Sequence, residues 1–135
     1  MYTAAARAKF VDQTVETASP AKQLTMLYDR MVLDLARAEV AQRHGERVAA
    51  NGHLQHAQDI VTELLASLRL DAWEGAPRLA SLYTYLLTQL VEANVTGDST
   101  KTMQCRELVE PLREAWHSAA QSVAAATPSL VGQLA

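Results

Sequence analysis

Two short patterns hold the residues of this chain whose types and spacing could support chemistry. Glu114 and His117 form a Glu-x-x-His pair, and His53 and His56 form a His-x-x-His pair in a polar segment near an expected helix start. Helical bundles that hold two metal ions need two Glu-x-x-His pairs and two further inward glutamates. Only one such pair is present, so the sequence argues against a native metal site and against a metal-dependent bundle enzyme.

Other reactive arrangements are also missing from the sequence. It contains no glycine-rich phosphate loop, no paired catalytic carboxylates and no convincing Ser/His/Asp set. The single cysteine, Cys105, cannot form an internal disulfide, which fits a reducing compartment, and it suits a small core position rather than a nucleophile. We therefore expect a protein that is not an enzyme and that carries no cofactor.

Composition favours packed helices over a sheet. The chain has 135 residues, enough for one domain with a real core, and 49% of them are hydrophobic. Leucine, alanine and valine dominate, with one phenylalanine and two tryptophans. Many small and aliphatic residues with few aromatics are typical of close-packed helices.

Charge and hydropathy exclude two classes of partner. The net charge is −3 and the 12 basic residues are scattered, which argues against nucleic-acid binding. The apolar runs are too short to insert into a membrane. The N-terminus lacks the apolar core of a cleaved secretion signal, so the expected location is cytoplasmic.

Four amphipathic segments with clear start and stop residues predict the fold. Ser19 and Pro20 suit the N-cap and first helical position, while Gly45 and Gly97 suit helix ends. Each segment is about 30 Å long and the connections are short, so the fold class is all-α, an antiparallel up-down four-helix bundle. Pro111 should kink the last helix. The predicted helices are residues 20–44, 48–70, 77–95 and 100–125.

The two ends of the chain look different from the bundle. Residues 1–16 are weakly amphipathic and read as a mobile N-terminal arm that can form a short helix. Residues 17–126 form the helical domain. Residues 127–135, a small-residue segment around Pro128 with no cap and no clear packing face, are expected to form a disordered tail.

Apolar stripes distinguish core from surface only in part. Leu27 and Met31 fit the core, whereas Tyr28 could lie in the core or touch a partner, because a phenol needs a wet or bonded edge. Tyr83 and Tyr85 must face different sides of their helix. The adjacent Leu86 and Leu87 widen its apolar face, which indicates either two core layers or a second apolar surface.

Segments along most of the chain, up to about residue 117, resemble the flagellar secretion chaperone family. No single segment is specific, but their order and spacing together are. Phe10 stands where such proteins often carry a tyrosine. The segments are Met1-Tyr2-Thr3, Thr17-Ala18-Ser19-Pro20, Met26-Leu27-Tyr28-Asp29 after Leu24, Leu82-Tyr83-Thr84-Tyr85-Leu86, Leu90-Val91-Glu92-Ala93-Asn94 before Asp98, and Leu112-Arg113-Glu114-Ala115-Trp116.

The resemblance implies a non-enzymatic export chaperone. Such proteins bind the disordered C-terminal segment of flagellin one-to-one in the cytoplasm, prevent premature polymerisation and deliver the subunit to the flagellar type III secretion apparatus. The alternative is a helical adaptor or regulatory bundle that binds another amphipathic helix. Contacts with export-apparatus components and a homodimer of the free chain stay open. The predicted partner-binding residues are Tyr2, Phe10, Tyr28, Tyr83, Leu86, Leu87, Leu90 and Asn94.

Two of these assignments carry a further hypothesis or an alternative. We expect Tyr2 and Phe10 to fold over an empty partner groove and to be displaced on binding. Unchanged partner affinity after deletion of residues 1–16, with no gain of exposed apolar surface, would contradict this. Asn94 either ends its helix before Gly97 or bonds the backbone of a partner.

Overall fold

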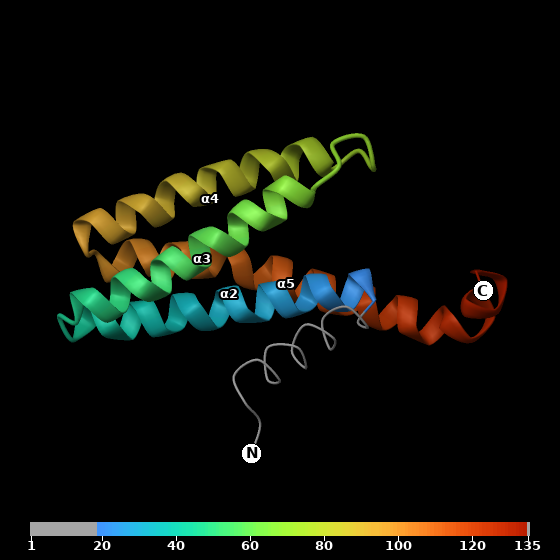
Figure 1. Cartoon of the computed structure of the whole chain (residues 1–135), viewed down its shortest axis with the longest axis horizontal. Coiled ribbons are helices and arrows are strands. Elements are labelled where there is room, and N and C mark those ends of the chain that lie inside the picture. The colour runs from blue at the N-terminus through green and yellow to red at the C-terminus, as the bar shows by residue number, and fades with distance from the viewer. Residues whose placement is uncertain (1–18, 135) are drawn as a thin grey trace, which may run out of the picture. The chain divides into compact units, whose positions relative to one another are not determined.

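The computed structural model describes residues 19–134, with side chains described through residue 123, and every regular element in this part of the chain is helical. The predicted all-α class is confirmed (Figure 1). The arm at residues 1–16 lies outside the described residues. The last helix continues through Pro111 and Pro128, past the predicted end at residue 125. The helices are α2 (Pro20–Arg43), α3 (Arg47–Ser67), α4 (Ala76–Thr96) and α5 (Ser99–Leu134).

The chain divides into two compact units. One unit is Asp29–Pro111, which contains the whole of α3 and α4 with adjoining parts of α2 and α5. The other unit combines Met1–Tyr28 with Leu112–Ala135. In this second unit, the predicted cap of α2 is confirmed, because the Lys22 N–H donates to Ser19 Oγ at 3.1 Å.

Glycine ends two of the helices in the Asp29–Pro111 unit. Gly45 has φ 70° and Gly97 has φ 69°, a left-handed conformation that side chains with a Cβ rarely adopt. After α2, the Glu46 N–H returns to the Ala41 carbonyl at 2.8 Å, which stops the helix. Both glycines were predicted from the sequence to mark these ends.

The polar contacts of this unit show its antiparallel arrangement. Arg106 of α5 bonds Glu39 of α2, and Thr102 of α5 bonds Gln42 of α2. The α5 residue number therefore falls as the α2 number rises, so the two helices run in opposite directions. α3 and α4 also pack against each other. The predicted up-down order of neighbouring helices is thus confirmed within this unit.

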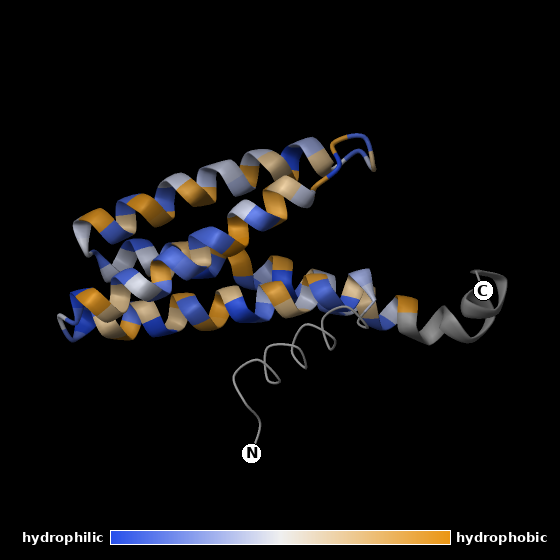
Figure 2. Ribbon diagram, viewed as in Figure 1, coloured by the Kyte–Doolittle hydropathy of each residue, from blue (hydrophilic) through white to orange (hydrophobic). Residues whose placement is uncertain are grey.

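One apolar stripe from each helix forms the interior of the Asp29–Pro111 unit. Figure 2 shows these apolar positions alternating with polar ones along the helices. Full burial of each large aliphatic side chain stabilises the fold by about 1.5–3 kcal/mol. The largest fully buried hydrophobic side chains here are Tyr83, Met31, Leu35, Leu54, Leu86, Leu90, Val61 and Val109.

Cys105 belongs to this interior, as predicted. Its side chain is buried, and that burial raises the pKa of the thiol from 9.0 to about 11, although the nearby Lys101 opposes the shift. The thiol is therefore neutral and shielded in the folded protein.

We expect Cys105 to resist iodoacetamide at pH 8 in the native protein and to react at once in denaturant, as followed by mass spectrometry. Because its pKa is raised on folding, its contribution to stability is complete below pH 9 and is lost as the pH rises to about 11. Compared with Cys105→Ala, the wild type should therefore lose more stability across that range. Native-state labelling at the denatured rate would contradict this prediction.

Candidate protein-binding surfaces

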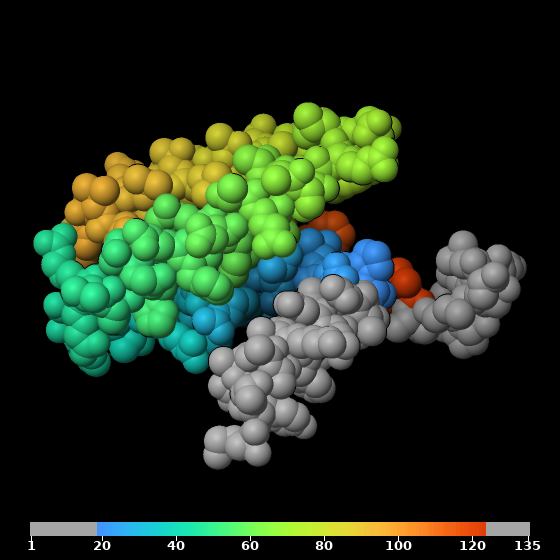
Figure 3. Space-filling view, viewed as in Figure 1, coloured from blue at the N-terminus to red at the C-terminus, as the bar shows by residue number. Residues whose placement is uncertain are grey.

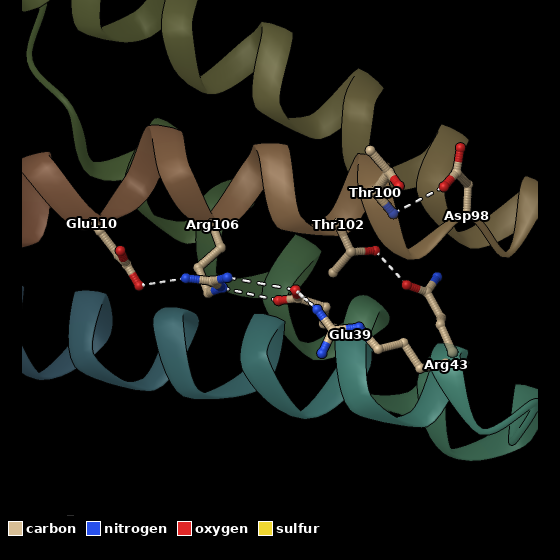
Figure 4. A network of polar contacts seen from close by, with 8 residues as sticks. Glu39, Arg43, Asp98, Thr100, Thr102, Arg106 and Glu110 are labelled. Carbon is tan, nitrogen blue, oxygen red and sulfur yellow. Dashed lines mark hydrogen bonds and ion pairs between the residues drawn. The ribbon is translucent and has the colours of Figure 1, made fainter.

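The most prominent polar group in the Asp29–Pro111 unit is a network between α2 and α5. Glu39 is almost fully buried, yet its carboxylate binds two guanidinium groups, those of Arg43 and Arg106. Arg106 also donates to Glu110 at 3.0 Å. Figure 4 shows these side chains joined in a row between the two helices.

The chemistry of this network is structural rather than catalytic. Hydrogen bonds that the Arg106 guanidinium donates to Glu39, and then to Glu110, raise the pKa of Arg106, so its guanidinium stays charged. A permanently charged arginine cannot shuttle protons. No buried side-chain nitrogen or oxygen among the described residues lacks a hydrogen-bond partner, so none of them is left as an unpaired reactive group.

A second buried carboxylate connects α2 with α3. Asp34 is fully buried and accepts a hydrogen bond from Arg30 Nε at 3.1 Å. His56, one of the histidines considered for metal binding, bonds the other oxygen of Asp34. Within residues 19–123, no three His, Cys, Asp or Glu side chains gather closely enough to hold a metal ion.

A shallow groove between α2 and α3 is the first candidate surface for binding a partner. Its volume is about 350 Å³. Small alanines let another chain approach closely, while Arg37, Glu46 and His53 add polar groups to its lining. Figure 3 shows the face on which these two helices lie side by side. This α2–α3 groove is lined by Ala36, Arg37, Val40, Ala41, Glu46, Ala49 and His53.

Exposed aliphatic side chains extend the groove along α2. Val40 is 49% exposed, and Leu33, two turns earlier on the same helical face, is 41% exposed. Apolar residues spaced seven apart beside a groove suit an amphipathic helix laid along it. The arrangement can therefore bind a peptide through burial of apolar area.

The outer face of α4 is the second candidate surface. Val91 and Val95 are exposed, and Leu87 and Asn94 are half-buried beside them. Leu87, Val91 and Val95 recur every four residues, so they form one row along the helix. Asn94 Nδ2 donates to Asn51 Oδ1 of α3 at 2.7 Å. We call Leu87, Val91, Asn94 and Val95 the α4 outer row.

The structure separates the predicted partner-binding residues into three groups. Tyr2 and Phe10 lie outside the described residues. Leu87 and Asn94 come together on the accessible α4 outer row. The other four are buried in the free protein, so their contact with a partner stays a prediction that requires the helices to open. These four are Tyr28, Tyr83, Leu86 and Leu90.

The two tyrosines of α4 separate as expected. Tyr83 is buried and Tyr85 is 53% exposed, because residues two apart face different sides of a helix. Leu86 and Leu87 separate in the same way, with Leu86 in the core. The extra apolar width of this helix therefore leads to a second apolar surface rather than to a second core layer.

Sequence reasoning missed the α2–α3 groove. Leu33, Ala36 and Val40 recur at i, i+3 and i+7, a second apolar stripe beside the core stripe of the same helix. That pattern was readable, but alanine and valine on a helix face carry a weak signal. The groove itself depends on how α3 packs beside α2, which the pattern does not specify.

No helix among the described residues is both long enough and apolar enough to span a bilayer.

Comparison with known proteins gives a consistent result. The family model described as "Flagellar protein FliS" matches residues 2–123. The chain is 31% identical over 123 residues to the flagellar secretion chaperone FliS of Salmonella typhimurium, covering 86% of this chain and 90% of that protein. It is 28% identical over 113 residues to the flagellar secretion chaperone FliS of Bacillus subtilis, covering 84% of each.

Proposed function

The chain belongs to the FliS family of flagellar secretion chaperones, which are not enzymes, and on this basis we propose that it is an export chaperone for flagellin. In this proposal it binds the disordered C-terminal segment of flagellin one-to-one in the cytoplasm. Binding keeps the segment from polymerising and allows delivery to the flagellar export apparatus. We refer to that flagellin segment below as the client.

The α2–α3 groove, with its exposed Leu33 and Val40, is the observation that supports this proposal most directly. An amphipathic client segment could bury its own apolar stripe along these residues as it folds into a helix. Ordering a disordered segment costs about 2–5 kcal/mol, so a useful complex needs a long interface. The α4 outer row offers further apolar surface for the same chain.

Calorimetry with a peptide of the flagellin C-terminal segment tests the proposal. We expect one-to-one binding, together with a gain of helicity in circular dichroism, because the segment orders as it binds. No binding at tens of micromolar would favour the alternative, an adaptor bundle for another amphipathic helix. The mass of the free chain in solution would show whether it self-associates through the same apolar surface.

The α4 outer row predicts a moderate effect on client binding. Leu87→Asp is expected to lower the affinity for the client about tenfold, since it places a charge among Val91, Asn94 and Val95. Tyr85→Asp is the matched control, because this exposed tyrosine lies on a different face of α4. The two variants should be compared by calorimetry and by urea unfolding.

Equal effects of Leu87→Asp and Tyr85→Asp on affinity would exclude the α4 outer row from the client surface. A loss of stability in Leu87→Asp as large as its loss of affinity would instead identify Leu87 as a core residue.

A further inference from the structure

A hollow lined in part by amide side chains and by Arg47 lies at one end of the Asp29–Pro111 unit, beside the turns that follow α2 and α4. Its volume is about 240 Å³, room for several water molecules and thus for a small polar group of a ligand. We call it the end pocket. Its lining includes Gln42, Gly45, Arg47, Ala50, Asn94 and Gly97.

The amide side chains of the end pocket are held in place by the protein. Gln42 Nε2 donates to the Ala93 carbonyl at 3.1 Å, and Gln42 Oε1 accepts from Thr102 Oγ1 at 2.6 Å. Asn94 is fixed through Asn51 of α3. Because these groups are already ordered, a ligand would lose little affinity to their rearrangement.

Arg47 gives the pocket its charge. Its Nη2 lies 3.6 Å from the point where a Cβ on Gly97 would stand, so the guanidinium lies beside that glycine. Arg30, Arg43 and Arg106 each bind a carboxylate.

Among the residues that the structure describes, Arg47 has no carboxylate partner. The neighbouring Glu46 lies near His44 instead, at 3.9 Å. A guanidinium matches the geometry of a carboxylate and can bind it through two parallel hydrogen bonds. A hollow that combines ordered amide side chains with an available arginine therefore suits a carboxylate ligand.

We propose that the end pocket binds a carboxylate group of the client through Arg47. This inference rests on the proposed function for the identity of the client, but not for the chemistry of the pocket. The carboxylate can be the C-terminal group of the client or an acidic side chain within it. In either case it would fix the position of a segment whose apolar residues lie elsewhere on the protein.

The first experiment uses the full chain and three flagellin tail peptides, measured by calorimetry. One peptide has a free C-terminus, one is amidated there, and one has its acidic residues replaced by their amides. Each is titrated into the wild type, into Arg47→Gln and into Arg78→Gln. Arg78 is the matched control, an exposed arginine of α4 without a carboxylate partner in the described part of the chain.

We expect one of the two modified peptides, either the amidated one or the one without acidic residues, to bind about tenfold more weakly than the unmodified peptide. This loss should occur with the wild type and with Arg78→Gln. That difference should vanish with Arg47→Gln. If the amidated peptide loses affinity, the group that binds Arg47 is the terminal carboxylate. If the peptide without acidic residues loses affinity, the group is an acidic side chain. Equal affinity of all three peptides for the wild type, or a difference that persists in Arg47→Gln, overturns the proposal.

A second measurement keeps the pocket testable without the client. Sodium acetate is titrated against the amide resonances of Gly45 and Gly97, with sodium chloride and acetamide as controls. In the wild type, both resonances should shift and reach half-saturation at an acetate concentration on the order of 10 mM. In Arg47→Gln, these shifts should be absent. If no peptide binds but acetate does, the proposed function fails and the pocket stands. If acetate leaves both glycines unshifted, the pocket is refuted as a carboxylate site.

Discussion

Leu33→Glu combined with Val40→Glu is expected to weaken client binding about 100-fold while leaving the folded protein intact. Both side chains are substantially exposed, so their replacement removes little buried area from the core. Replacing one apolar side chain in an interface is expected to cost about 1.4 kcal/mol of binding free energy, a factor of ten, so two such replacements correspond to the stated change. Calorimetric titration with the flagellin tail peptide measures it directly.

A matched surface change distinguishes the groove from apolar surface in general. Leu70→Glu alters an exposed leucine in the connection between α3 and α4, away from the α2–α3 groove. Its effect on affinity should be less than about twofold. If the Leu33 and Val40 double variant binds as tightly as the wild type, the client does not use this groove. If it unfolds, single replacements by serine provide the same comparison at lower risk.

Removal of Glu39 is expected to have the largest effect on stability among single charge changes. Glu39→Ala leaves Arg106, whose side chain is only 25% exposed, without its main partner. Breaking a buried ion pair from one side costs about 3–5 kcal/mol. Because Arg106 retains Glu110 and some access to water, we expect about 3 kcal/mol, the lower end of that range, measured as a loss of unfolding free energy in urea.

The reason for that loss can be separated from simple loss of packing. Glu39→Met together with Arg106→Met should recover most of the stability, since apolar side chains of similar volume replace both charges. Glu92→Ala, which removes an exposed partner of Lys101, should cost less than about 1 kcal/mol. If the double methionine variant is as unstable as Glu39→Ala, the loss does not come from leaving Arg106 without a partner. The ion pair itself would then stabilise the fold.

The start and stop signals of the helices were readable from the sequence because they are local. Ser19 caps α2 through a residue three positions away, and Gly97 ends α4 through its own backbone conformation. Asp98 begins α5 by accepting a hydrogen bond from the Thr100 N–H at 2.9 Å. Each signal involves residues within a single turn, so no knowledge of neighbouring helices is needed.

The roles of individual apolar residues were less predictable. Tyr28 was open between core and partner surface, and its complete burial depends on packing that its own stripe does not specify. Leu87 and Leu86 are adjacent and identical in type, yet only Leu86 enters the core. Hydropathy gives the period of a helix, but the angle at which the helix faces its neighbours decides which edge of a wide stripe is covered.

By itself, then, the sequence determined where the helices begin, the short turns after α2 and α4, and the family, whereas the last helix runs past its predicted end. These follow from local capping and from the order of motifs along the chain. Only the tertiary structure decided which residues form surfaces. The burial of Glu39 with Arg106, the α2–α3 groove and the end pocket around Arg47 each combine residues from different helices. Such groups depend on how helices pack against one another, and periodicity within one helix carries no information about its distant partner.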